Sequence, residues 1–207
     1  MKSLTAMMVL TLTWGAAEAA AKSKPALDHV AVYLSLGPVN FSGTRMTMAT
    51  SQANRLFEAA GIKLDWKDGI PKKNEMGRVV VIRFVATAPA CYSTRENSNV
   101  MASAMPYGER PLSITVFGDR VGPLLAQFNE RLAGRVLGHV LAHELGHVLE
   151  GVARHSEAGL MKAHWTTPDF IVMGAEGLAL DAHDVDLLRN SFGGKLTGDS
   201  LAKAQGR

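Results

Sequence analysis

The segment 133–150 constrains the fold of this chain most, because it combines the periodicity of a helix with polar side chains that an ordinary core helix lacks. Apolar residues gather on one side of the expected helix, and no salt-bridge pattern accompanies them. The other side carries His143 and His147, with Glu144 directly after the first histidine. The sequence therefore predicts an inner helix that presents polar groups toward a cleft.

The spacing of these three residues predicts a metal site. Positions i and i+4 of a helix lie one above the other, so both imidazoles can reach one Zn²⁺ at about 2.0–2.1 Å. Glu144 is rotated by about 100° from His143. Its carboxylate is therefore expected beside the ion, where it can take a proton from metal-activated water. A catalytic zinc of this kind also needs a third protein ligand and an open position for water.

Other histidines nearby are candidates for the third ligand. His139 shares the helix face, but it stands eight residues from His147, about 12 Å along a straight helix, so we expect it to be a satisfied neighbour. His155 can reach the ion if the chain turns at Gly151, since glycine readily adopts the left-handed conformation that ends a helix. His155 is therefore the predicted third ligand. The alternatives that the sequence leaves open are Glu157, Glu176 and His164.

The stretch HELGHVLEGVARHSEAGLM, residues 143–161, resembles the metzincin clan of zinc metallopeptidases. The signature of that clan is HExxHxxGxxH followed by a methionine turn. His143, Glu144 and His147 match it position for position, and 159–161 (Gly-Leu-Met) resembles the Met-turn of the matrix-metalloprotease type. The glycine, however, stands four residues after the second histidine instead of three, and the last histidine stands eight after it instead of six.

The resemblance implies hydrolysis of a peptide or protein substrate, with Glu144 as general base and Met161 packed beneath the ion without binding it. It also implies that 112–117 is an edge strand that pairs with an extended substrate. The other interpretation of this segment is an ordinary strand of the sheet. The zinc ligands that the resemblance implies are His143, His147 and His155. Two other interpretations are a catalytically silent, secreted zinc-containing binding protein and a gluzincin-type peptidase with a glutamate as third ligand.

The order of the expected elements predicts one α+β domain. By the resemblance, it is a single metzincin-like domain with a mixed twisted sheet, an active-site helix, a Met-turn and a C-terminal helix. The stretches 89–111 and 151–180 are expected to be irregular, apart from a short extended piece near 101–105. Strands are expected at 28–36, 62–66, 78–86 and 112–117, and helices at 47–60, 120–131, 133–150 and from 181 onward.

Residues 1–21 have the layout of a secretory signal peptide, with a charged start, a short apolar run and small residues at the cleavage region. The catalytic domain is then 22–207, secreted or periplasmic. The apolar run is too short for a membrane span, so we expect no stable membrane anchor. A net charge of +3 without a basic stripe argues against nucleic acid as a partner.

Several other side chains allow more than one interpretation. Trp165, Phe170 and Met173 are expected to form either a substrate pocket or plain core. The single cysteine, Cys91, is expected to be a small buried residue. Asp181 is expected to cap the last helix.

Overall fold

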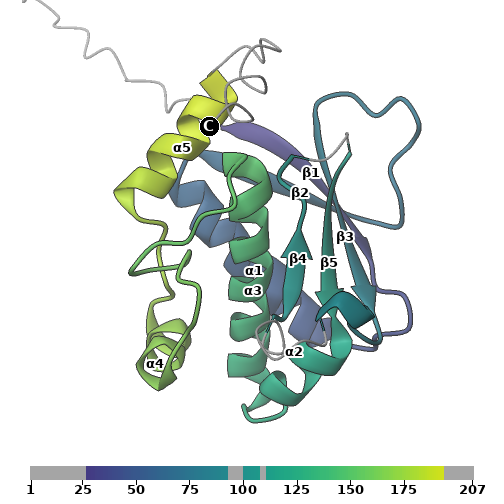
Figure 1. Ribbon diagram of the computed structural model, residues 1–207, viewed down its shortest axis with the longest axis vertical. Helices are drawn as coiled ribbons and strands as arrows, with labels where there is room; N and C mark the ends of the chain where they lie inside the picture. Colours follow the sequence, from purple (N-terminus) through teal and green to yellow (C-terminus); the bar gives the residue numbers. More distant parts are fainter. Residues whose placement is uncertain (1–26, 93–99, 108–110, 194–207) are drawn as a thin grey trace, which may run out of the picture.

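Five strands form one mixed sheet, and the helices pack mainly against one of its faces (Figure 1). The computed structural model describes residues 27–92, 100–107 and 111–193. The strands are β1 (Asp28–Ser35), β2 (Ile62–Asp68), β3 (Arg78–Val85), β4 (Ala102–Ala104) and β5 (Leu112–Phe117). The α-helices are α1 (Gly43–Ala59), α2 (Gly118–Leu125), α3 (Glu130–Glu150), α4 (Thr167–Ala175) and α5 (Ala182–Gly193).

The strand order is β2-β1-β3-β5-β4. The first four strands in this order are parallel, and β4 pairs antiparallel with β5. The expectation that Leu112–Phe117 is an edge strand is therefore wrong. This strand is hydrogen-bonded on both sides, and the short strand β4 forms the edge.

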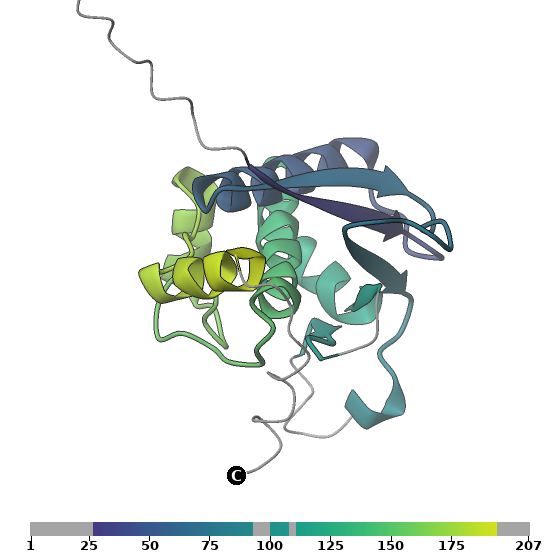
Figure 2. The same ribbon diagram turned by 90° about the horizontal axis from the view of Figure 1, so that it is seen from above.

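Alternation along the central strands separates the two faces of the sheet. Val30 and Val32 of β1 join the main core under the helices, whereas Tyr33 of the same strand lies in a smaller cluster with Val79 and Val81 of β3. This is the period of two that a strand imposes on its side chains. Helices α1 and α3 pack against each other, and in the view from above α1 runs across α3, which is seen nearly end-on (Figure 2).

Helix α3 is the central helix of the fold, and its residues from 133 to 150 are all buried. It begins where the Asn129 side chain accepts a hydrogen bond from Leu132 N, at 3.0 Å. It crosses α1 closely at Gly138, where an added Cβ would lie 2.6 Å from the carbonyl oxygen of Ala49. The predicted inner helix is confirmed: its polar residues from Arg135 onward are buried, and it contacts α1, α4, α5 and the strands β4 and β5.

The structure differs from the expected elements in two places. The helices expected at 120–131 and 133–150 are divided earlier, because Asn129 caps a new helix. Helix α4 was missed inside the stretch expected to be irregular. Its signal is the sequence Thr-Thr-Pro-Asp, in which Asp169 Oδ2 accepts a hydrogen bond from Thr166 N at 2.6 Å.

The fold class is confirmed as one α+β domain with a mixed sheet, a central helix and a C-terminal helix. Cys91 is exposed, so the expectation of a buried cysteine is wrong. The expected signal peptide at 1–21 lies outside the described residues. Among the described residues, no helix has the length and apolar character that a membrane crossing requires.

Candidate metal centre

The chain reverses direction at Gly151, as the third-ligand prediction requires. Gly151 has φ 72° and ψ 26°, the left-handed conformation, and its N–H donates to the carbonyl of His147 at 3.1 Å. A residue with a Cβ is strained in this conformation, whereas glycine adopts it freely. Helix α3 therefore ends directly after Glu150, and the following segment can return toward the helix face that carries the histidines.

The reversal brings three imidazoles together. Ligand nitrogens of His143, His147 and His155 all lie within 4.8 Å of one another. The ring of His155 stacks on that of His143 at a centroid distance of 5.4 Å and meets the ring of His147 edge-on at 5.0 Å. Among the described residues, no other group of three histidine, cysteine or acidic side chains converges in this way, and neither Glu157 nor Glu176 joins this one.

Backbone carbonyls fix the tautomers of the two helix histidines. His143 Nδ1 lies 2.9 Å from the carbonyl oxygen of Leu160, and His147 Nδ1 lies 3.3 Å from that of Val152. A carbonyl oxygen can only accept, so each Nδ1 carries the proton and donates it. In the neutral rings, both Nε2 atoms therefore present lone pairs toward the middle of the cluster.

This donor set fits a metal ion. The two Nε2 atoms lie 3.1 Å apart, close to the roughly 3.3 Å expected for two nitrogens bound to one tetrahedral zinc. Two facing lone pairs repel each other unless a cation lies between them. Burial lowers the pKa of His143 to about 4 and also lowers the pKa values of His147 and His155, so the three rings are neutral and ready to bind a metal at neutral pH.

Glu144 follows His143 directly on α3 and is 9% exposed. Burial raises the pKa of this carboxyl group to about 8. Such a shift is typical of an acid or base held ready in an active site.

The Gly159–Met161 turn forms the floor below the histidine pair. Met161 is fully buried, and a Cβ added to Gly146 would lie 2.6 Å from its sulfur atom. Leu160 receives the hydrogen bond from His143, as described above, and its own N–H donates to Ala179 at 2.8 Å. The Met-turn suggested by the sequence is thus packed against the helix that carries the histidines.

The three apolar candidates near the site have different environments. Met173 is fully buried core, and the ring of Phe170 packs against Phe128 at 5.2 Å. Only Trp165 meets the cluster, with its ring edge-on to that of His143 at 5.6 Å. Of the three, Trp165 alone can therefore contribute apolar surface directly beside the histidines.

Two other polar residues of α3 lie outside the cluster. His139 is fully buried, donates from Nδ1 to the carbonyl of Arg135 at 2.7 Å and accepts from Leu178 N at 3.0 Å, which makes it the satisfied neighbour that the sequence suggested. Glu150, the last residue of α3, is 6% exposed, and neither carboxylate oxygen has a hydrogen-bond partner. Burial raises its pKa to about 8.

The sequence missed one residue of this region altogether. Asp184, in the first turn of α5, is fully buried and binds the side chains of both neighbours of His155. No local pattern distinguishes such a residue, because its partners stand about thirty positions earlier in the chain.

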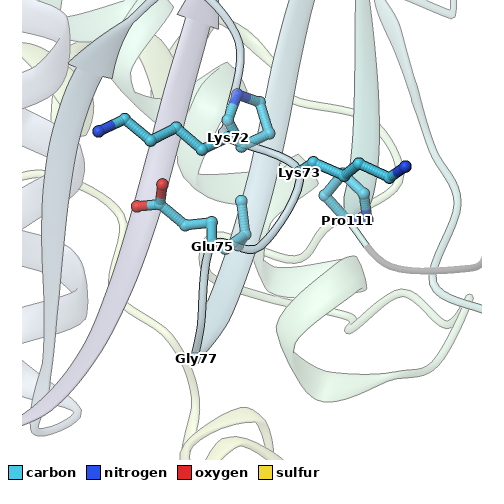
Figure 3. A pocket seen from close by; sticks show the side chains of 7 residues that line it. Lys72, Lys73, Glu75, Gly77 and Pro111 are labelled. Atoms are coloured by element: carbon cyan, nitrogen blue, oxygen red, sulfur yellow. The ribbon is translucent and has the colours of Figure 1, made fainter.

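A separate hollow of about 210 Å³ lies on the loop between β2 and β3 (Figure 3). Lys72, Lys73 and Glu75 line it together with Pro111 from the start of the β5 segment. None of its lining residues belongs to the histidine cluster.

No protein-family model and no curated protein matches the sequence. Among solved structures, archaemetzincin from Methanopyrus kandleri, a crystal structure at 1.5 Å resolution, is similar with a TM-score of 0.51 and 14% sequence identity. The match covers 81% of this chain and 97% of that chain. The protein has the archaemetzincin fold. At this identity the likeness extends to the fold, and the chemistry has to be argued from the residues of this chain.

Proposed function

We propose that this protein is an exported, zinc-dependent metalloendopeptidase. The observation that carries the proposal is the convergence of three imidazoles at the end of a buried helix that also bears the buried Glu144. The archaemetzincin fold and the match of the helix to the metzincin signature support the same conclusion. Export is proposed from the signal-like sequence of residues 1–21.

His143, His147 and His155 would hold the zinc ion. Bound zinc supplies Lewis-acid chemistry, which makes water a nucleophile near neutral pH and polarises a carbonyl group. Glu144 would accept the proton of the attacking water and pass it to the leaving amine. A cation beside this buried carboxyl group favours its ionised form, so the same group that is protonated near pH 7 in the metal-free protein can act as a base in the loaded one.

An extended substrate is proposed to pair with β4, which is the edge strand among the described residues, and not with β5 as the sequence suggested. β4 contacts α3, so a strand added there would run along the helix that bears the histidines. Trp165, edge-on to His143, would offer apolar surface to a substrate side chain near the scissile bond.

The test is cleavage of unfolded casein, with and without a chelator, alongside the metal content of the purified protein. We expect near-stoichiometric zinc and cleavage that the chelator abolishes. In Glu144→Gln, zinc should stay bound while turnover falls by about 10²–10⁴-fold or more. Glu150→Gln is the matched control, since it removes a second buried carboxylate of the same helix and should keep turnover within a few fold.

Full activity in Glu144→Gln would contradict the mechanism. A wild-type protein that holds zinc but cleaves no peptide would favour the catalytically silent binding protein instead.

A further inference from the structure

A single carboxylate from the C-terminal helix binds the residues on both sides of His155. Asp184, in the first turn of α5, is fully buried. Its Oδ1 forms an ion pair with Arg154 Nη2 and also accepts a hydrogen bond from Ser156 Oγ at 3.1 Å. His155 stands between these two residues, so the chain is attached to α5 immediately before and immediately after the third imidazole.

Asp184 is itself held in place. Its Oδ2 accepts from Asp181 N at 2.9 Å, and its own N–H donates to Asp181 Oδ1 at 2.7 Å. This reciprocal pair fixes the start of α5, as capping interactions do. Asp184 therefore offers Arg154 and Ser156 a rigid partner, because its contacts with Asp181 fix its orientation independently of either of them.

The imidazole of His155 lacks the support that the other two have. His143 and His147 each donate to a backbone carbonyl, whereas the His155 ring is exposed and, among the described residues, makes ring contacts but no hydrogen bond. Its direction toward the other two rings must then come from the backbone on either side of it. In that stretch, Ser156 N donates to the carbonyl oxygen of Met161 at 2.8 Å, and Asp184 binds the side chains of Arg154 and Ser156.

We propose that Asp184 is a positioning residue for the third metal ligand: by binding Arg154 and Ser156 it holds His155 toward the other two histidines. The inference rests on the proposed zinc site. It also accounts for the lengthened spacing. A segment two residues longer than the metzincin signature has more conformations to lose when it closes on an ion. Attachment to α5 removes that freedom before the metal binds, so less binding energy is spent on ordering.

The test measures metal affinity rather than peptide cleavage. Zinc dissociation constants are determined for wild type, Asp184→Asn, His155→Ala and the double variant. Loss of a residue that supports a metal ligand typically weakens metal binding by about 10–100-fold, and we expect a loss of this size in Asp184→Asn. In the His155→Ala background, the same substitution should change the affinity by less than about twofold, because the group on which it acts is absent. Asp186→Asn, an exposed carboxylate of the same helix, is the matched control and should bind zinc as wild type does.

The visible absorption of the Co²⁺-loaded protein is a second readout. The spectrum of Asp184→Asn should shift toward that of His155→Ala, whereas that of Asp186→Asn should not. If Asp184→Asn does not fold, Ser156→Ala, which removes one hydrogen bond to the same carboxylate, should weaken zinc binding several-fold, and again only when His155 is present.

Equal losses of affinity from Asp184→Asn in both backgrounds would overturn the inference, because they indicate general destabilisation. The inference is also overturned if Asp184→Asn binds zinc as tightly as wild type does. If Asp184→Asn does not fold, the same outcome in Ser156→Ala overturns it. In these cases the proposed function stands as long as His155→Ala weakens binding. A wild-type protein that takes up no zinc would instead overturn the proposed function and, with it, this inference.

Discussion

The close crossing of α1 and α3 gives the sharpest stability prediction. In Gly138→Ala, the added Cβ would lie 2.6 Å from the carbonyl oxygen of Ala49 and 2.7 Å from the Cβ of Gln52. Ordinary contact begins near 3.4 Å, so the helices would have to separate by about 0.8 Å. Both contacts involve atoms on or next to the α1 backbone, which a rotamer change cannot move. Overpacking of this kind costs about 1–3 kcal/mol, and we take the upper end.

Part of this loss of stability is offset, because alanine favours the helical conformation over glycine by about 1 kcal/mol. We therefore expect a net loss of about 2 kcal/mol, which lowers the melting temperature of a domain of this size by about 4–8 °C. Thermal unfolding followed by circular dichroism measures it. Gly43→Ala is the control, since nothing lies within 4 Å of its added Cβ, and it should not lower the melting temperature. A Gly138→Ala variant as stable as wild type would show that the helices do not cross as closely as described.

Three further predictions concern the end of α3 and the floor of the site. Gly151→Ala should lower the free energy of unfolding by about 1–2 kcal/mol through its left-handed backbone alone, and Gly151→Asn should lower it by less. Chemical denaturation measures both losses. Gly159→Ala should lower the free energy of unfolding by more than Gly151→Ala does, because its Cβ would also lie 2.5 Å from the carbonyl oxygen of Ala179. Equal losses of stability in the two variants would contradict the described packing of the turn. Glu150 has a pKa of about 8 in the folded protein and 4.5 as a free group, so the folded state binds its proton more tightly than the unfolded state does. Its ionisation therefore lowers the free energy of unfolding as the pH rises from 4.5 toward 8. In the presence of a chelator, the difference in melting temperature between Glu150→Gln and wild type should therefore grow in favour of the variant between pH 5 and pH 8. At pH 7 the difference in the free energy of unfolding should reach up to about 3 kcal/mol. A melting-temperature difference that is the same at pH 5 and pH 8 would refute this.

The parts of the fold that the sequence predicted are those decided by local patterns. The buried helix followed from its period, and the reversal at Gly151 followed from the conformational freedom of glycine. Strands β1 and β3 were found because their apolar residues form unbroken or alternating runs. In each case neighbours along the chain determine the structure, so the prediction needed no knowledge of what lies across the core.

The errors arose where partners distant in the sequence decide the outcome. The sequence of β5 fits an edge strand and a central strand equally well, and the three-residue strand β4 that covers it is too short to show a period. Helix α4 was missed because its capping signal follows a run without periodicity. Its C-terminal carbonyls are satisfied by Arg135 of α3, a contact that no local pattern reveals.

The candidate metal centre combines both kinds of determinant. His143 and His147 are placed by helical spacing alone, and for that reason the sequence identified them directly. His155 depends on a turn, on a loop longer than the signature allows, and on Asp184, whose partners lie about thirty residues earlier. The departure from the signature spacing and the buried carboxylate are therefore parts of one explanation: the longer loop needs an anchor outside itself, and α5 supplies it.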